Sequence, residues 1–561
     1  MACRLRSLLV FLGFAFALSG CHVAGTRGGE DASAPGSGGS STGAGAGGSG
    51  GAVVLDAGGS GSGGAPVPPA CNPTCSDFPP DAIVVGVGAA IPGMFGPAGT
   101  GMAGAGPCVL DPQDGTLFPS NWLRPRIRFQ PGLGQTAFEI RVHSDQQKND
   151  LVVYTDQTSW AMPKDVWGKL VTHQGGDPVT VTVRSLAMAA GGATTVAVSA
   201  PVAFRIAPVT VGGSIVYWTT SGVPSLKGFH VGDEAVTPVM TPNMVGPTVQ
   251  CIGCHVSTPD GQFIGMAANL AIMNADPAAL AIRSGTTMME PPFLTAAARQ
   301  LIGRPYQPLS AFSAAHWKDH DHVALSMLQN MNIIWTDLEA ASMDQDVGWG
   351  IIARNGDTGT PVCPAWSHDG QSIVYTSATG ITDTGVRIQT GVGTLYTVPY
   401  NDRKGGDAKP LPGGGVPGFH AYYPAFSPDD QLIAFTRAPS TGTNYDVPEA
   451  EIFVMPRDGT PMPTRLLAND PPQCANRVSP GVTNSWPKWA PTVGTANGTV
   501  YRWLTFSSRR NAGGLPQIFV TAITVDAAGA VKTYPALHLW NQPETESNHT
   551  PAWDDFKIVV Q

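Results

Sequence analysis

The pentapeptide Cys251-Ile252-Gly253-Cys254-His255 has the residue types and spacing most specific to one chemistry in this sequence. It matches the C-x-x-C-H pattern of covalent haem c attachment. In that pattern two thiols three positions apart reach the two vinyl groups, and the adjacent imidazole is presented to the iron. We therefore expect Cys251 and Cys254 to hold haem c, with His255 as an axial ligand. The alternatives are a disulfide-forming CxxC, or two buried thiols with His255 as a polar core residue.

Other side chains near this motif could complete a haem or metal site. Met266 is a candidate for the second axial ligand because thioether sulfur binds haem iron, whereas its alternative role is apolar core filling. His320 and His322, which follow His316, are two positions apart. On a strand both side chains would face the same side, where they could bind a transition metal. The alternative for this group is a solvated polar turn.

The second half of the chain repeats a short pattern that specifies strands and tight turns. It begins with a proline and an aromatic residue two positions later, at Pro364, Pro424, Pro487 and Pro551, which are separated by 60, 63 and 64 residues. The Asp-Gly or Asp-Asp pair that follows the first two is typical of a hairpin turn, because these residues tolerate positive φ. Self-similarity at a nearly fixed period predicts stacked four-stranded units that close into a ring.

The register Pro-Ala-Trp/Phe-Ser-x-Asp-Gly-x-x-Ile at residues 364–373 resembles the TolB-like, WD-type β-propeller repeat. The string Ser507-Ser508-Arg509-Arg510 is also typical of that family. The resemblance implies a propeller over residues 209–561, with six blades as the best interpretation and seven as the alternative. Residues 214–218 would open the ring, and residues 557–560 would close it. Residues 258–264 fit the same register and place His255 on Pro364, so the pentapeptide leads into a strand and does not open a helix.

The first twenty residues describe an export signal. Arg4 and Arg6 precede an apolar run over residues 8–18, which is too short to span a bilayer stably. Leu18-Ser19-Gly20-Cys21 resembles the lipobox of bacterial lipoproteins, which implies cleavage before Cys21 and acylation of that residue. The alternative is an ordinary signal peptide with an incidental cysteine. A histidine at position 22, where aspartate is absent, resembles lipoproteins sent to the outer membrane of Gram-negative cells, so we expect a lipid-anchored protein of the cell envelope.

Composition separates the chain into a tether and a globular body. Of the 69 glycines, 17 lie within residues 25–64, and such a segment cannot bury enough apolar surface to order itself. We therefore expect a signal peptide over residues 1–20 and a lipidated, flexible tether over 21–70. The net charge of -9, without a lysine/arginine-rich run, argues against nucleic acid as the principal partner.

The region between tether and repeats carries the pattern of a β-sandwich. Over residues 119–208, short alternations of apolar and polar residues recur at sandwich-like spacing and resemble fibronectin type III modules. Trp160, Trp167 and Leu170 lie between the expected strands, where a sandwich would bury large side chains. Residues 71–118 read as a loop-rich segment in which Cys71 or Cys75 is expected to pair with Cys108. The whole chain is thus expected to be all-β.

The sequence contains no G-x-S-x-G elbow, P-loop, H-E-x-x-H or dinucleotide fingerprint, which disfavours an enzyme. The first functional hypothesis is a membrane-anchored lipoprotein whose propeller binds a protein or envelope partner. The alternative is a periplasm-facing electron-transfer protein that uses haem on Cys251 and Cys254 and passes electrons to a redox partner.

Overall fold

The computed structural model describes residues 71–559, except for positions 72, 189–193, 271–278, 305–310, 329–331, 381, 384–386, 389, 442–443 and 445. The signal peptide, the tether and the expected lipidation site Cys21 lie outside the described residues. Strands form most of the regular structure, so the expected all-β class is confirmed. Within the described part, no helix has the length and apolar character needed to cross a bilayer.

The described helices are short and lie between strands. They are α1 (Ile91–Met94), α2 (Lys164–His173), α3 (Pro242–Val245) and α4 (Ala296–Ile302), with 3₁₀ turns η1 (Ala314–His316), η2 (Leu467–Asn469) and η3 (Gln473–Ala475).

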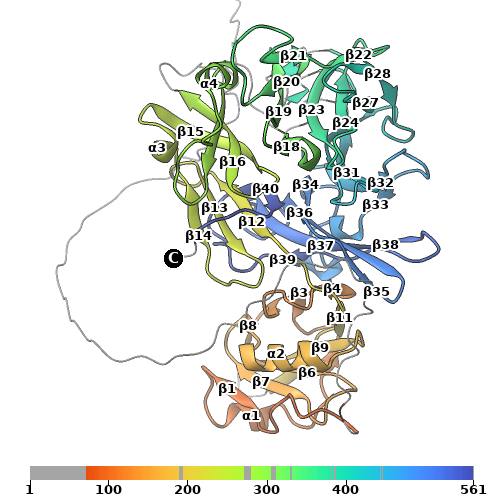
Figure 1. Ribbon diagram of the computed structural model, residues 1–561. Coiled ribbons are helices and arrows are strands. Elements are labelled where there is room, and N and C mark those ends of the chain that lie inside the picture. The colour runs from red at the N-terminus through yellow and green to blue at the C-terminus, as the bar shows by residue number, and fades with distance from the viewer. Residues whose placement is uncertain are drawn as a thin grey trace, which may run out of the picture.

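Two sheets form the N-terminal body, which is the orange part of Figure 1. The larger sheet contains, in order, β1 (Ile83–Val85), β7 (Leu151–Thr155), β6 (Gln135–His143), β9 (Val179–Met188), β10 (Thr194–Val198) and β2 (Met102–Ala103), with β11 (Val202–Ile206) pairing with β9 and β4 (Thr116–Phe118). The smaller sheet contains β3 (Cys108–Asp111), β5 (Arg126–Gln130) and β8 (Ser159–Ala161). Ile127 and Phe129 on β5 alternate with more exposed neighbours, as a strand with one buried face requires.

Helix α2 was not expected from the alternating pattern. It buries Trp167 and Leu170 among the strands, and the indole N–H of Trp167 donates to the carbonyl of Trp122 at 3.1 Å. Trp160, by contrast, lies on β8 and is half-buried. All three side chains therefore contact the core as expected, but Trp167 and Leu170 do so from a helix.

The segment 71–118 contributes strands to both sheets. β1 pairs with β7, β2 with β10, β3 with β5 and β4 with β11. The expected pairing of Cys71 or Cys75 with Cys108 is wrong, because Cys71 bonds Cys75. Cys108 instead bonds Cys474, 366 residues away, with 5.5 Å between the two Cα atoms. The reason is that β3 lies beside η3, so this disulfide ties the N-terminal body to the rest of the chain.

Successive small antiparallel sheets make up the rest of the chain, and Figure 1 shows them above the N-terminal body. The first three, each given in sheet order, are β14 (Thr237–Met240), β13 (Ser225–His230), β12 (Ser214–Thr219) and β40 (Asn548–Asp554); β15 (Val249–Ser257), β16 (Phe263–Leu270) and β17 (Ala279–Ser284); and β18 (Trp317–Lys318), β19 (Asp321–Leu328), β20 (Asn332–Asp337) and β21 (Trp349–Ile351).

The remaining sheets continue in chain order. They are β23 (Thr360–Trp366), β24 (Ser372–Ala378), β27 (Gly393–Pro399) and β29 (Lys409–Pro410); β30 (Phe419–Phe426), β31 (Leu432–Pro439), β32 (Glu451–Pro456) and β33 (Thr464–Arg465); and β34 (Ser485–Trp489), β36 (Thr499–Ser508), β37 (Gln517–Val525) and β38 (Val531–Thr533), with β35 (Gly494–Ala496) and β39 (Leu537–His538) on β36 and β37. Two ribbons, β22 (Ala353–Asn355) with β28 (Gly405–Asp407) and β25 (Thr382–Asp383) with β26 (Arg387–Ile388), lie beside them.

The last strand of the chain closes this series. β40 pairs with β12, so the C-terminal strand completes the sheet that begins the series. The segment expected to do this, residues 557–560, comes after β40 and its described part is not a strand. Strand β40 also contacts β15 and β34, and β34, β30 and β23 contact one another in turn. Strands arranged in this way surround a centre, which is the arrangement of a β-propeller.

The repeated turns have one hydrogen-bond pattern. In three repeats a hydroxyl group donates to an aspartate two residues later and accepts the backbone N–H five residues later. The hydroxyl–aspartate pairs are Thr258–Asp260, Ser367–Asp369 and Ser427–Asp429, at 2.6, 2.6 and 2.7 Å. Gly261 and Gly370 close the first two turns with φ near +70°, a conformation that glycine adopts without strain. The repeat read from the sequence is therefore a structural repeat.

Each of five inner strands contains a bulge at one equivalent position. The residues at these bulges all have positive φ, between 39° and 59°, and each directly precedes the repeat proline or its equivalent. They are Cys254, Cys363, Tyr423, Trp486 and Thr550. For non-glycine residues this conformation costs about 1 kcal/mol or more, and it gathers at functional sites. The bulges therefore mark the centre of the ring as the place to look for function.

Candidate functional site

The CxxCH motif lies within β15 and spans its bulge. Cys251 packs into a buried cluster with Val216 and Met266, and it is 8% exposed. Cys254 is the positive-φ residue of the bulge. The motif is therefore part of a propeller strand, as its register with residues 363–364 predicted.

His255 is enclosed by neighbouring strands. Its Nε2–H donates to the carbonyl oxygen of Val216 on β12 at 3.0 Å, and its Nδ1 is buried without a hydrogen-bond partner. Burial lowers the pKa of His255 to about 4, so the imidazole is neutral at neutral pH. Met266 lies directly opposite His255 in the β15–β16 ladder and is fully buried.

These residues do not fit a haem in this arrangement. Met266 and His255 are side by side on paired strands, whereas two axial ligands must approach the iron from opposite faces. The Nε2 atom of His255, moreover, is already used by the carbonyl of Val216. These contacts disfavour the haem that the motif predicts on Cys251, Cys254 and His255, and no step of the function is derived from it.

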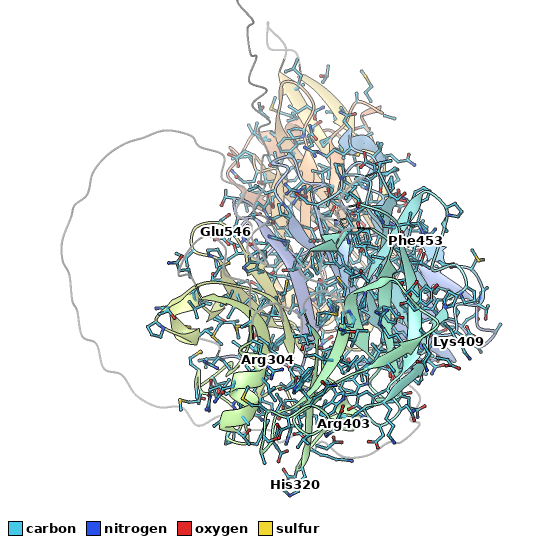
Figure 2. The ribbon with its side chains drawn as sticks, turned by 90° about the horizontal axis from the view of Figure 1, so that it is seen from above. Arg304, His320, Arg403, Lys409, Phe453 and Glu546 are labelled. Atoms are coloured by element: carbon cyan, nitrogen blue, oxygen red, sulfur yellow. A yellow bond between two sulfur atoms is a disulfide. The ribbon has the colours of Figure 1, made fainter. Side chains whose placement is uncertain are left out.

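The three histidines of residues 316–322 go to different partners. His316 bonds Asp321 at 2.9 Å. His322 is buried, bonds Glu339 at 2.5 Å and stacks on Phe293. His320 is almost fully exposed and projects from the edge of the molecule in Figure 2, with its Nδ1 3.6 Å from Glu339. Among the described residues, His320 and His322 thus approach one carboxylate but do not form part of a three-ligand metal cluster.

A pocket of about 350 Å³ lies where the inner strands end, just after the bulges. Each sheet of the series, or the segment next to it, contributes to the lining, through residues 256–259, 311–312, 314, 364–366, 368, 425–426, 428, 488–491 and 553–555. Prolines, alanines and aromatic rings form most of the wall. A concave site with an apolar wall and a few polar groups is the usual form of a ligand site.

Lys488 is the cation of this pocket. Burial lowers its pKa, while Asp554 and the thiols of Cys363 and Cys254 act in the opposite direction. The described residues place neither an ion pair nor a hydrogen bond on its ammonium group. Lys488 therefore has hydrogen-bonding capacity left for a ligand.

Asp554 and His368 are two further titratable groups in the lining of the pocket. Burial raises the pKa of Asp554 to about 6, although the backbone N–H of Ser257 donates to its carboxylate at 3.3 Å. Burial works to lower the pKa of His368, but the 2.8 Å hydrogen bond to Asp430 outweighs it, and the net shift is upward. Perturbed groups gathered in one pocket are a mark of functional sites.

Lys488 and Asp554 were not among the site residues predicted from the sequence. A signal was present in the repeats, since Lys488 stands where the equivalent positions carry Ala365, Ala425 and Ala552. The small alanine side chain suits packing between neighbouring strands at this position, and a lysine in a single repeat departs from that pattern. That departure is the signature of a site built on a repeat.

No family model and no curated protein matches this sequence. The chain is similar in structure to hydrazine synthase from Kuenenia stuttgartiensis, with 10% identity, a TM-score of 0.38, and coverage of 61% of this chain and 46% of that chain. It is also similar to a prolyl endopeptidase, with 12% identity, a TM-score of 0.29, and coverage of 59% of this chain and 48% of that chain. A third similar structure is oligogalacturonate lyase in complex with manganese, with 11% identity, a TM-score of 0.28, and coverage of 58% of this chain and 74% of that chain. The chain thus spans less than half of the hydrazine synthase chain. Likeness this distant carries no argument about activity.

Proposed function

We propose that this chain is a lipid-anchored binding protein of the cell envelope, in which a six-bladed propeller holds a polar group of a protein or envelope partner. The observation that carries the proposal is the pocket at the end of the inner strands, with Lys488 and Asp554 inside it. A cation and a carboxyl group that do not pair with each other can each engage a ligand. The proline- and tryptophan-rich wall supplies apolar contact around them.

Under this proposal the N-terminal body is a spacer between the anchor and the propeller. Its two sheets support a fibronectin type III-like interpretation of residues 119–208, from which α2 and the strands contributed by residues 71–118 are departures. Trp122 of this body packs against Trp553, with 5.6 Å between the two ring centroids, so the spacer contacts β40, the strand that closes the ring.

The proposal is tested by photo-crosslinking in the native cells. A benzophenone amino acid at Asp555, an exposed residue of the pocket, is expected to capture a discrete partner. The same probe at Leu133, which is fully exposed on the N-terminal body, is the positional control. Lys488→Met should lower the adduct yield about tenfold, the effect of losing one charge-assisted hydrogen bond. Lys409→Met, at an exposed site, should leave the yield unchanged.

Two outcomes would contradict the proposal. One is an adduct that forms equally well from Leu133, because it would show contact that does not depend on the pocket. The other is an undiminished yield in Lys488→Met when circular dichroism shows that this variant is folded.

A further inference from the structure

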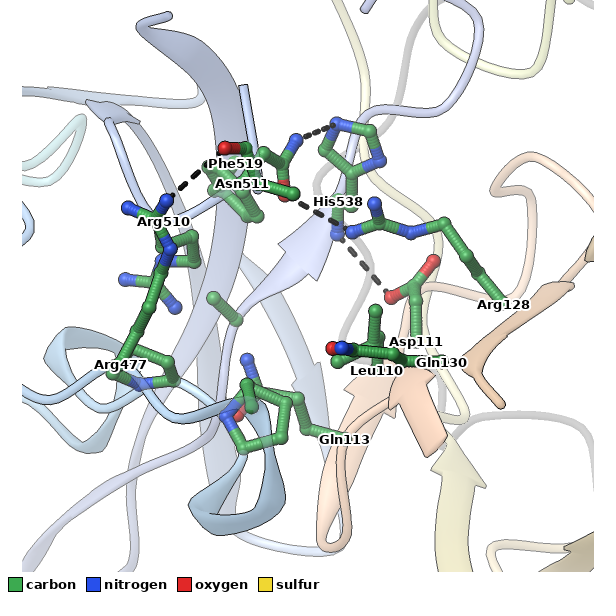
Figure 3. Close-up of a pocket in the computed structure, with 15 residues that line it drawn as sticks. Leu110, Asp111, Gln113, Arg128, Gln130, Arg477, Arg510, Asn511, Phe519 and His538 are labelled. Carbon is green, nitrogen blue, oxygen red and sulfur yellow. Dashed lines mark hydrogen bonds between the residues drawn. The ribbon is translucent and has the colours of Figure 1, made fainter. Parts of the chain in front are cut away.

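A second cavity lies at the contact between the N-terminal body and the propeller. Its volume is about 70 Å³, and Figure 3 shows the residues around it. Asp111 and Arg128 come from β3 and β5 of the N-terminal body. Arg510, Asn511 and His538 come from the propeller. The cavity therefore exists only when the two bodies are in contact.

Arg510 is a buried cation that no carboxylate neutralises within ion-pair distance among the described residues. Its Nη2 donates to the carbonyl oxygen of Ala468 at 2.5 Å and to Asn484 at 2.7 Å, and its guanidinium lies over the ring of Phe519. Its Nη1 is buried and has no hydrogen-bond partner. Burial lowers the pKa of Arg510 to about 9. A buried charge without a counter-charge is costly, so an anion here would relieve a penalty.

A hydrogen-bond relay fixes the tautomer of His538. Arg128 Nη2 donates to Asn511 Oδ1 at 3.0 Å, which leaves the amide nitrogen of Asn511 to donate to His538 Nε2 at 3.2 Å. The ring proton of neutral His538 must then be on Nδ1. That atom is buried without a partner, as is Nε of Arg128. The lining of the cavity thus holds three buried donors with nothing to donate to.

Asp111 is the acidic group of this lining. Burial raises its pKa to about 7, with Arg128 acting in the opposite direction. Its carboxyl group accepts the backbone N–H of His538 at 3.4 Å. Near neutral pH a large fraction of Asp111 is therefore protonated and does not repel an anion.

We propose that this cavity binds one small tetrahedral oxyanion of the phosphate or sulfate class through Arg128, Arg510 and His538. The volume suits one such ion, and an organic acid of larger size would have no room. The three unpartnered donors belong to residues that line the cavity, and an oxyanion there would accept charge-assisted hydrogen bonds from them. Because the ligands come from both bodies, the ion would also bind them together, beside the Cys108–Cys474 disulfide.

The test compares phosphate, sulfate and chloride at equal ionic strength on the purified chain. Isothermal titration should show one phosphate or sulfate ion per chain, and the melting temperature should rise with its concentration, as expected for a ligand of the folded state. Arg128→Gln should weaken binding at least about tenfold, since it removes a charged donor and the start of the relay. Arg126→Gln is the matched control, because both arginines approach Glu544, at 3.6 and 3.9 Å, but Arg126 does not line the cavity.

Each result decides the proposal. Selective binding of phosphate, of sulfate or of both, lost in Arg128→Gln and kept in Arg126→Gln, supports it and identifies the ion. Equal stabilisation by chloride, no binding to the native chain, or equal loss in both variants overturns it. If Arg128→Gln does not fold, NMR titration of His538 in the native chain replaces it, with a phosphate-dependent rise of the His538 pKa as the supporting result and an unchanged pKa as the contrary one.

Discussion

Lys488 and Asp554 show how single residues turn a structural repeat into a site. Both lie in inner strands whose equivalents at Pro364, Pro424, Pro487 and Pro551 carry alanine or serine at the same register, and both have their pKa shifted mainly by burial. A buried ionisable group that is not paired destabilises the fold, so its presence is explained best by a function.

Asp554→Asn tests this cost directly. The folded-state pKa of Asp554 is raised from 3.8 to about 6, so its contribution to stability is complete below about pH 4 and is lost as the pH rises to about 6. The asparagine variant should therefore be more stable than the native chain above about pH 6, by up to about 3 kcal/mol, and should lose this advantage near pH 4. Urea unfolding across this pH range measures the difference.

Asp319→Asn, at an exposed position, is the control and should show no such pH-dependent gain. A constant difference between Asp554→Asn and the native chain at all pH values would argue against a raised pKa.

At the scale of the element, β15 decides what the CxxCH motif can do. In an extended strand with a bulge at Cys254, the motif residues contact different neighbours: Cys251 and His255 the buried strands, and Cys254 the surroundings of Lys488. The motif alone indicated haem with good reason, because its spacing is rare. In this strand His255 is engaged by the carbonyl oxygen of Val216 and lies opposite Met266.

The chain is expected to carry no covalent haem when it is produced in a host with haem c maturation. The physical reason is that His255 Nε2 is occupied by the carbonyl of Val216 and that Met266 lies beside His255 on a paired strand. A pyridine haemochrome spectrum of the purified chain is the measurement. A covalent haem that disappears in Cys254→Ser would restore the electron-transfer function.

At the scale of the molecule, the N-terminal body and the propeller share one core. A single buried cluster contains Ile127 and Val153 of the first and Ile215 and Trp503 of the second, so the two are packed as one unit. The expected anchor and tether precede this unit. Several acyl chains on Cys21 would hold it at the membrane, whereas one chain alone gives only marginal binding.

Cys21→Ser should release the chain from the membrane fraction and abolish its metabolic labelling with palmitate. Cys3→Ser is the matched control, because Cys3 belongs to the signal peptide that the sequence predicts to be removed, and it should change neither property. Membrane association that persists without acylation in Cys21→Ser would show that another segment provides the anchor.

The repeats, their turns and the all-β class were readable from the sequence because they depend on local chemistry. Asp369 and Gly370 form a turn with neighbours a few residues away, and the same hydrogen bonds recur around Ser427. Helix α2 escaped prediction because its buried residues, Trp167 and Leu170, also suit a sandwich core.

The sites were decided by the tertiary structure, because their residues are distant in the chain. Cys108 forms a disulfide with Cys474, 366 residues away. At the second cavity, Arg128 donates a hydrogen bond to Asn511, 383 residues away. No local pattern encodes such contacts, since they depend on how whole sheets pack. The sequence by itself determined the strands and the turns of this protein. Only the closure of the ring decided that Lys488 and Asp554 share a pocket, and that the CxxCH motif is held in a buried strand.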